Sequence, residues 1–290
     1  MFLRMIWVGA IVIVLMGNGC KNVSKKQSAA NDSTFNELLL CRMGTIEYEI
    51  KTVKSVATSN ADKKHVIAEV HIKYPELRCA NNKLKYSVSD YINKLIQDLL
   101  KENMNEEDTA KARSIKSASS AFINSSKKNI ENYQKLNPDD RQQVWYCDII
   151  GNVEMQSNNY ITIRFNYDSY TGGAHSNYAQ FWATFNIGNG KKITWDDILA
   201  DKDKFTKLAE LRFKQINGLP LNQKLTQSEG FLFENDKFYL SDNFGLSKNG
   251  IIMYFEPYQV APYSFGASEL YFKYIEIAEM LNPTLFDNPI

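Results

Sequence analysis

Residues 160–185 constrain the fold more than any other stretch, because aromatic and β-branched residues alternate with polar ones on both sides of a short turn. This period of two is typical of half-buried β-strands. The turn contains Gly172 and Gly173, which can adopt backbone angles that a side chain forbids and so allow a tight connection or the close approach of another backbone. Both glycines are therefore candidate binding residues. The pattern predicts a β-hairpin whose turn displays three ring side chains for recognition, those of Tyr170, His175 and Tyr178.

The remaining sequence predicts two sheets with helices between them. In the N-terminal half, the expected elements are strands at 45–56 and 64–74, the second ending at Pro75, a helix beginning at Ser87, and a helix over 105–136 that Pro138 ends. In the C-terminal half, they are strands at 143–155, 238–240, 250–255 and 267–272, a short helix capped by Thr194, a helix over 203–217, and a final short helix. Segregated strands and helices indicate an α+β fold with antiparallel sheets, in two domains at residues 41–140 and 141–290.

The amino terminus has the features of a bacterial lipoprotein signal. Arg4 precedes a short apolar run, and small residues then lead to Cys20. The run is too short for a comfortable membrane span, so residues 1–19 are predicted to be removed and Cys20 to be lipidated. Residues 20–40 are small and polar, which predicts a flexible tether. An uncleaved anchor is the alternative, and both place the body in the cell envelope, facing the periplasm or the cell exterior.

Charge and cysteine content narrow the classes of function. Residues 148–290 contain 17 acidic and 12 basic residues, a net charge of −5, whereas residues 20–147 have a net charge of +5. The acidic C-terminal half favours a cationic partner and disfavours nucleic acid. Cys41, Cys79 and Cys147 allow three disulfide pairings, of which Cys41 with Cys79 is preferred because both lie in the N-terminal domain. Their spacing predicts no metal site, and no cofactor is expected.

Nucleophilic catalysis needs a serine or cysteine beside a base that a carboxylate orients. His175 is the only histidine of the C-terminal half, and Asp168, Ser169 and Ser176 are near it in sequence. No nucleophile elbow accompanies them, so a structural or ligand-contacting role for His175 is favoured over acid–base catalysis. The sequence therefore favours a binding protein over an enzyme.

A second aromatic segment follows the strand predicted at 250–255. It contains Tyr258, Tyr263 and Gly266, and two prolines stiffen it. Tyrosines on such loops provide contact area at little entropic cost, which is typical of surfaces that bind proteins or sugars. Tyr258, Tyr263 and Gly266 are therefore candidate binding residues, whereas Phe255 and Phe265 are expected in the core.

Two motifs stand out in the C-terminal half, FNYDSYTGGAHSNYAQFWATFNIGNGKKITWDDIL at 165–199 and GLSKNGIIMYFEPYQVAPYSFGASEL at 245–270. Together they resemble the RsiV-like C-terminal domain family, over residues 144–281. More weakly, HIKYP at 71–75 and SVSDYINKLIQDLL at 87–100 resemble the small domain that usually precedes it. The family includes a lysozyme-sensing anti-sigma factor and a peptidoglycan polysaccharide deacetylase.

The resemblance implies a binding domain outside the cytoplasm, with the PYSFG segment near its partner. In the deacetylase, catalysis belongs to a separate metal-dependent domain, and the anti-sigma factor needs a cytoplasmic segment and a membrane span, so neither activity is expected here. We therefore interpret the chain as a non-catalytic lipoprotein that binds a lysozyme-like protein or peptidoglycan glycan. The alternatives are a hydrolase that cleaves envelope polysaccharide through His175 and neighbouring carboxylates, and a structural accessory lipoprotein bound to another envelope protein.

Overall fold

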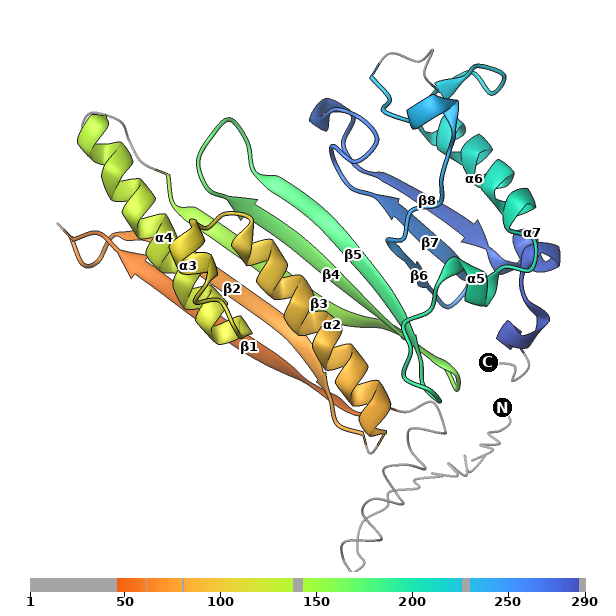
Figure 1. The fold of residues 1–290 in the computed structure, drawn as a ribbon, viewed down its shortest axis with the longest axis horizontal. Helices are drawn as coiled ribbons and strands as arrows, with labels where there is room; N and C mark the ends of the chain where they lie inside the picture. The colour runs from red at the N-terminus through yellow and green to blue at the C-terminus, as the bar shows by residue number, and fades with distance from the viewer. Residues whose placement is uncertain (1–45, 61, 80, 138–142, 226–229, 287–290) are drawn as a thin grey trace, which may run out of the picture.

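The computed structural model describes residues 46–60, 62–79, 81–137, 143–225 and 230–286. The predicted signal, the lipidation site Cys20, the predicted tether and Cys41 lie outside these residues. Figure 1 shows two sheets side by side, a larger one with helices over one face and a smaller one near the C-terminus. Within the described part of the chain, no helix is long and apolar enough to cross a membrane. The predicted α+β class is confirmed.

The larger sheet has five strands in the order of the sequence. They are β1 (Tyr48–Thr58), β2 (Val66–Leu77), β3 (Trp145–Gln156), β4 (Tyr160–Tyr170) and β5 (Asn177–Asn186). The predicted central hairpin is β4 and β5, in which Phe165 pairs with Phe181. Neighbouring strands are antiparallel except β2 and β3, which are parallel. A parallel pair requires a long crossover, and the sequence did not indicate this pairing.

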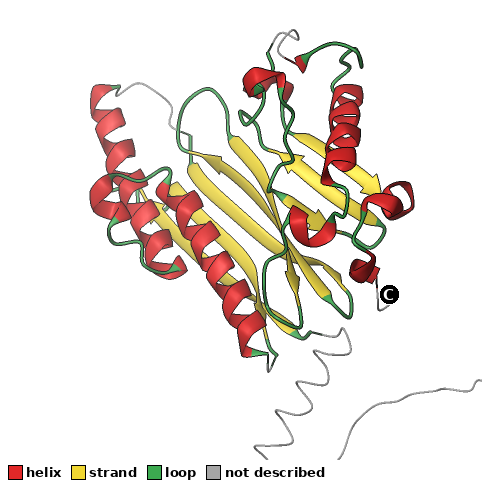
Figure 2. Cartoon of the chain, turned by 45° about the vertical axis from the view of Figure 1, so that its right-hand side comes forward, coloured by secondary structure: helices red, strands yellow, loops and turns green. Residues whose placement is uncertain are grey.

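Helices α2 (Asn82–Lys101), α3 (Glu106–Thr109) and α4 (Ile115–Leu136) form that crossover and lie along one face of the sheet (Figure 2). The helix predicted to begin at Ser87 begins earlier, because the side chain of Asn81 accepts a hydrogen bond from the backbone N–H of Leu84 at 3.2 Å and caps the first turn. The helix predicted over 105–136 is two helices, since Ser114 caps a new one. The predicted domain boundary after residue 140 falls between α4 and β3, so strands from both sides of it join one sheet.

Pro75 does not end the second strand as predicted, because β2 continues to Leu77. Pro75 pairs with Ile50 of β1, but β3 pairs only with residues 68–73 of β2. At Pro75, therefore, β2 has a neighbour on one side only. This is the edge-like position in which a strand tolerates a residue without an N–H group.

The smaller sheet is antiparallel and consists of β6 (Phe244–Leu246), β7 (Gly250–Phe255) and β8 (Ser268–Lys273). Helix α6 (Lys202–Ile216) packs against it through Phe205, Ala209 and Phe213. Short helices α5 (Trp195–Ile198) and α7 (Tyr274–Ile277) border it, followed by single turns at Ala278–Met280 and Pro283–Phe286, with others at Glu234–Asp236 and Tyr263–Phe265. Thr194 caps α5 as predicted, donating through its backbone N–H and its hydroxyl to Asp197 Oδ2 at 2.7 and 2.8 Å.

The prediction of a strand at 238–240 is wrong, and β6 was not predicted from the sequence. Residues 238–240 have no strand pairing, although Phe238 is buried in the second core. Residues 238–240 are apolar because they pack against this core. Over so short a run, the sequence pattern cannot distinguish a buried loop from a strand. The buried apolar side chains form two clusters, one from residues 46–187 and one from 193–285.

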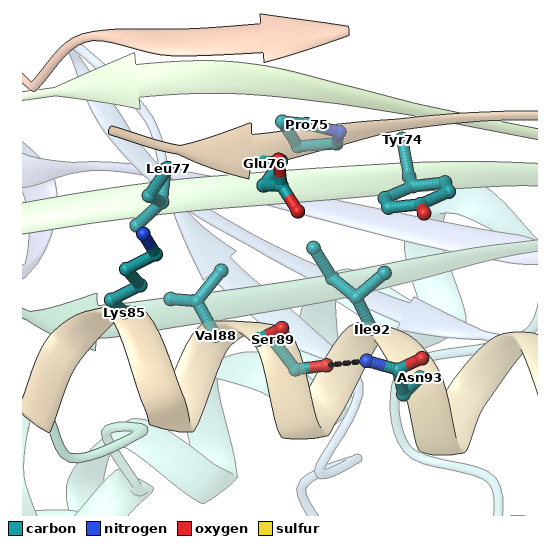
Figure 3. A pocket seen from close by; sticks show the side chains of 9 residues that line it. All are labelled: Tyr74, Pro75, Glu76, Leu77, Lys85, Val88, Ser89, Ile92 and Asn93. Atoms are coloured by element: carbon teal, nitrogen blue, oxygen red, sulfur yellow. Dashed lines mark hydrogen bonds between the residues drawn. The ribbon is translucent and has the colours of Figure 1, made fainter. Parts of the chain in front are cut away.

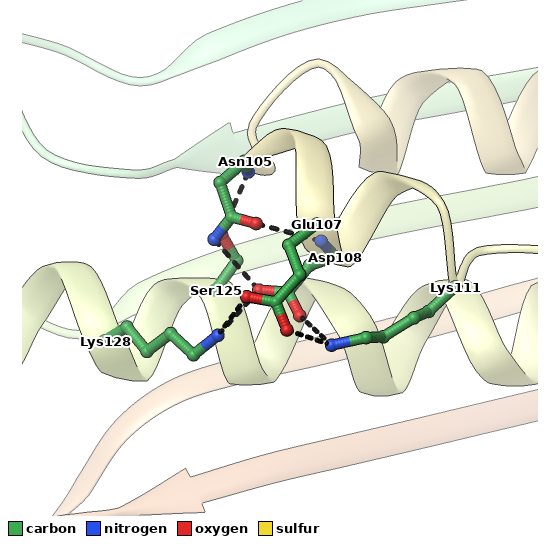
Figure 4. Close-up of polar contacts among 6 residues, drawn as sticks. All are labelled: Asn105, Glu107, Asp108, Lys111, Ser125 and Lys128. Carbon is green, nitrogen blue, oxygen red and sulfur yellow. Dashed lines mark hydrogen bonds and ion pairs between the residues drawn. The ribbon is translucent and has the colours of Figure 1, made fainter.

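Two polar features of the first cluster are buried. The thiol of Cys147 on β3 is free and fully buried, and burial raises its pKa. The pairing of Cys79 with Cys147 is therefore wrong, whereas both pairings with Cys41, which lies outside the described residues, stay predictions. The carboxylate of Asp108 is also buried and links α3 to α4 (Figure 4).

Asp108 accepts hydrogen bonds from Asn105 Nδ2 at 2.9 Å, Lys111 Nζ at 3.3 Å and Lys128 Nζ at 3.5 Å. Burial by itself would raise the pKa of this carboxyl group. The hydrogen bond from Asn105 and the two lysines outweigh burial and hold the pKa of Asp108 below its usual range.

Candidate functional site

The turn between β4 and β5 meets the loop between β7 and β8. The rings of His175 and Tyr263 are stacked, with centroids 3.8 Å apart and planes at 12°. Tyr258 lies 5.4 Å from Tyr263, and Tyr178 packs edge-on against Tyr263 at 5.8 Å. These four side chains, His175, Tyr178, Tyr258 and Tyr263, are called the aromatic cluster below. The structure thus brings together the turn after β4 and the aromatic segment after β7, which are two separate candidate binding segments in the sequence.

Hydrogen bonds orient the rings of the aromatic cluster. The Tyr263 hydroxyl donates to the carbonyl oxygen of Ser176 at 2.7 Å. His175 Nδ1 lies 2.9 Å from the same oxygen. Because a carbonyl only accepts, Nδ1 carries a hydrogen, and the other ring nitrogen, Nε2, faces the Tyr258 hydroxyl at 3.5 Å. The turn is therefore fastened to the loop through both the ring stack and the Ser176 carbonyl.

Three glycines of these segments adopt backbone angles that disfavour a side chain, which is a structural role for residues that the sequence suggested for binding. Gly172 and Gly173 have φ values of 93° and 100°, and a Cβ on Gly172 would lie 3.1 Å from Cζ2 of Trp145. Gly266 has a φ of 72°, and its Cβ would lie 3.0 Å from the Tyr178 hydroxyl oxygen. Side chains rarely adopt such angles, so glycine is favoured at all three positions.

Exposure differs among the aromatic residues. Tyr258, which itself has a φ of 69°, is 57% exposed, and Tyr178 is 39% exposed. Phe255 is fully buried, as predicted. The prediction that Phe265 belongs to the core is wrong, because its ring is 48% exposed, with one face against Phe231 at 5.0 Å.

Tyr170 stands apart from the aromatic cluster. Its ring stacks on Tyr146 with centroids 6.4 Å apart, and its hydroxyl donates to the carbonyl oxygen of Gly173 at 3.1 Å. The Tyr146 hydroxyl in turn donates to Asp168 Oδ1 at 3.1 Å. Tyr170 therefore supports the turn from the other end, through a partner on β3 that the sequence analysis did not identify.

A hollow of about 160 Å³ lies beside the aromatic cluster. Helix α2 provides Leu99 and the residue after it ends, Glu102, and the loop after β7 provides Glu256. The other lining residues come from β4, β5 and the same loop, and they are Tyr167, Asn177, Tyr178, Ala179, Phe181, Pro257, Tyr258 and Tyr263. The hollow continues along α2 past Asp98, Lys94 and Tyr91 toward Lys192. Sequence reasoning missed Glu102 and Glu256, because only the fold brings α2 next to the loop.

The end of α2 is held on the sheet by a short hydrogen-bond chain. The Thr171 hydroxyl donates to Asn103 Oδ1 at 3.0 Å, and Asn103 Nδ2 lies 3.4 Å from the Tyr167 hydroxyl. Ser169 donates to the same Tyr167 oxygen at 2.7 Å, in the buried interior. The wall of the hollow that carries Glu102 is therefore positioned by the residues that precede the turn.

The two carboxylates of the hollow are perturbed by their surroundings. Burial raises the pKa of Glu256; a hydrogen bond from Asn243 Nδ2 at 3.2 Å opposes this, and the charge of Glu102 adds to it. Burial and the nearby Asp98 raise the pKa of Glu102. Each carboxylate is thus less stable in its charged form than an ordinary exposed glutamate.

A smaller hollow, of about 70 Å³, lies between the end of β2 and α2 (Figure 3). Tyr74 and Pro75 face Val88 and Ile92 across it, and the one hydrogen bond drawn there joins Asn93 to the Ser89 carbonyl within the helix. It contains none of the predicted site residues. This hollow is a packing gap between strand and helix.

The described contacts of His175 are hydrogen-bonding contacts and a ring stack. The contacts of His175 in the structure are with the Ser176 carbonyl, the Tyr258 hydroxyl and the Tyr263 ring. No carboxylate hydrogen-bonds to His175 among the described residues. In the same part of the chain, no group of histidine, cysteine, aspartate and glutamate side chains is arranged to hold a metal ion.

Comparisons with known proteins agree with this architecture. The family model described as deacetylase PdaC matches residues 61–178, and that described as a protein of unknown function (DUF3298) matches residues 196–274. No curated protein matches the sequence.

Two crystal structures of DUF3298 family proteins share the fold. One, from Bacteroides fragilis, is 21% identical with a TM-score of 0.62, and the match covers 83% of this chain and 95% of that one. The other, from Pseudomonas aeruginosa, is 16% identical with a TM-score of 0.56, and the match covers 84% and 98%. The predicted resemblance is thus confirmed, and the chain contains a domain of the PdaC family followed by a domain of the DUF3298 family.

Proposed function

We propose that this protein is a lipoprotein of the cell envelope, anchored through Cys20, that binds a ligand through the aromatic cluster without transforming it. The candidate ligands are a lysozyme-like protein and peptidoglycan glycan. The PdaC and DUF3298 domains point to an envelope-associated family, which supports the location. The proposal that the protein binds a ligand rests on the geometry of the aromatic cluster.

The observation that carries the proposal is the stack of His175 on Tyr263. It joins two loops from separate parts of the chain into one surface, with Tyr258 exposed at its rim. Rings held by stacking and by the Ser176 carbonyl lose little conformational freedom when a ligand binds, so their contact area contributes efficiently to affinity. A polar, exposed aromatic surface of this kind suits both proteins and sugars.

The test is calorimetry of the full chain, purified in detergent, with a c-type lysozyme and with solubilised peptidoglycan, at low and physiological salt. We expect saturable binding of one of them, and Tyr258→Ala is expected to weaken it by about tenfold or more, as for an aromatic hot-spot residue. Tyr86, which is 73% exposed on α2, supplies the control Tyr86→Ala, expected to leave affinity unchanged.

Two outcomes would refute the proposal. If neither ligand binds at either salt concentration, the family-derived ligands are wrong. If peptidoglycan is cleaved and His175→Ala abolishes cleavage, the protein is a hydrolase instead. Stable co-purification with one envelope protein, insensitive to Tyr258→Ala, would favour the structural accessory role.

A further inference from the structure

The hollow beside the aromatic cluster contains two carboxylates that lack a cationic partner. Neither Glu102 nor Glu256 takes part in an ion pair within the part of the chain that the structure describes. Glu256 accepts one hydrogen bond, from the neutral amide of Asn243. The two carboxylates reach the hollow from different walls, α2 and the loop after β7. Glu102 is exposed and Glu256 is half-buried. Like charges that line one cavity repel each other, and a bound cation relieves that repulsion.

The walls of the hollow suit the stem of a long basic side chain. Leu99, Ala179 and Phe181 offer apolar surface for methylene groups. The rings of Tyr258 and Tyr263 lie at the same opening, and aromatic faces attract cations. In addition, the 20-residue helix α2 ends here, and the carbonyl groups at a helix C-terminus favour positive charge. The hollow thus combines apolar walls, aromatic rings at its opening and two carboxylates.

We propose that this hollow binds the terminal cation of a lysine or arginine side chain from a basic protein partner. The proposal rests on the proposed function, because the partner that covers the aromatic cluster would insert the side chain. The net charge of −5 over residues 148–290 favours a basic protein and disfavours polyanionic envelope polymers. Of the two candidate ligands, the hollow therefore favours a lysozyme-like protein over peptidoglycan glycan.

Other charged groups face the same cavity and must be considered with the pair. They are Lys94 and Asp98 on α2, Lys192 after β5, and Asp242 before β6. The Lys192 ammonium lies over the Tyr91 ring at 5.2 Å, and burial lowers its pKa. His175 lies in the aromatic cluster beside the opening. Lys94 and Lys192 line the groove together with Glu102 and Glu256, and neither lysine forms an ion pair with these two carboxylates within the described part of the chain.

The first test is calorimetry of the full chain in detergent with a c-type lysozyme. Glu102→Gln and Glu256→Gln are each expected to weaken binding by about fivefold or more, and the double variant further. Glu279→Gln is the control, because Glu279 is an exposed carboxylate ion-paired only with Lys204 on the surface. An unchanged affinity of the double variant, with an unchanged melting temperature, overturns the proposal.

The second test separates this proposal from the proposed function by using a small probe. N-acetyl-arginine amide is titrated against the full chain and followed by NMR. Saturable shifts that disappear in the Glu102→Gln/Glu256→Gln double variant support the cation site even if lysozyme does not bind. Shifts identical in the wild type and the double variant, or no shifts at all, show that the hollow does not take a cation, whatever the lysozyme result.

The third test distinguishes the source of the cation. Solubilised peptidoglycan is compared before and after acetylation of its free amines. If native peptidoglycan binds, and binding is lost both on acetylation and in the double variant, the cation comes from a stem-peptide amine and the protein-partner assignment is wrong. If acetylation has no effect while lysozyme binding needs both carboxylates, the assignment to a protein side chain holds.

Discussion

His175 and Tyr263 stack ring on ring at 3.8 Å, although one lies in the turn between β4 and β5 and the other in the loop before β8. The Tyr263 hydroxyl also donates to the Ser176 carbonyl next to that histidine. The two sheets of the molecule are therefore fastened at the candidate site itself. Any change at Tyr263 acts on both the surface and the order of the turn.

Substitution of Tyr263 separates its two contacts. Tyr263→Phe keeps the stack but loses the hydrogen bond, so the free energy of unfolding is expected to fall by about 0.5–1.5 kcal/mol. Tyr263→Ala also removes the ring and is expected to accelerate amide hydrogen exchange in residues 172–177. Urea denaturation and hydrogen-exchange mass spectrometry measure these effects. Exchange of the turn that is unchanged in Tyr263→Ala would show that the stack does not hold it.

The adjacent glycines of the turn form a matched pair. Gly172→Ala and Gly173→Ala both force a side chain into positive φ, which is expected to cost about 1–3 kcal/mol. A Cβ at Gly172 also meets Trp145 at 3.1 Å, whereas a Cβ at Gly173 has open space. Gly172→Ala should therefore be the more destabilising in thermal unfolding. The reverse order would mean that the Trp145 contact is relieved at no cost.

Asn243 closes the outer edge of β5. Its Oδ1 accepts from the backbone N–H of Trp182 at 2.8 Å, and its Nδ2 donates to the Gln180 carbonyl at 2.6 Å. Asn243→Ala leaves both backbone groups without this partner and is expected to cost about 2–4 kcal/mol in chemical denaturation. Asn93→Ala, which removes an exposed contact within α2, is the control and should change stability by less than about 0.5 kcal/mol.

Asp108 is expected to make stability depend on pH. Its pKa lies below the ordinary 3.8, so its contribution is present above pH 3.8 and is lost as pH falls through the lower folded-state value. Asp108→Asn is expected to cost about 1–3 kcal/mol at neutral pH, because the buried hydrogen bonds lose their charge. The difference from wild type should shrink toward pH 2.

Denaturation of both proteins across this pH range tests the expectation. Glu107→Gln is the control, since Glu107 is exposed and pairs with the same two lysines. It should change stability by less than about 1 kcal/mol. A cost of Asp108→Asn that stays constant with pH would show that charge is not the source of the effect.

Elements with a local pattern were predictable from the sequence. The alternation over residues 160–185 produced β4 and β5 as predicted, and Thr194 with Asp197 capped α5. These features depend on neighbours within a few residues, so a period of two or a capping residue is enough to predict them. The predictions at residues 238–240 and at Pro75 were wrong because the outcome there depends on the tertiary surroundings and not on neighbouring residues in the sequence.

Three features arise only in the folded chain: the parallel pairing of β2 with β3, the stack of His175 on Tyr263, and the hollow lined by Glu102 and Glu256. Each depends on residues far apart in the chain that approach because apolar surfaces pack, and that packing leaves no periodic signal in the sequence. The residues of the candidate surface were visible in the sequence. Their partners became visible only when burial of the two cores placed α2, the turn and the loop together.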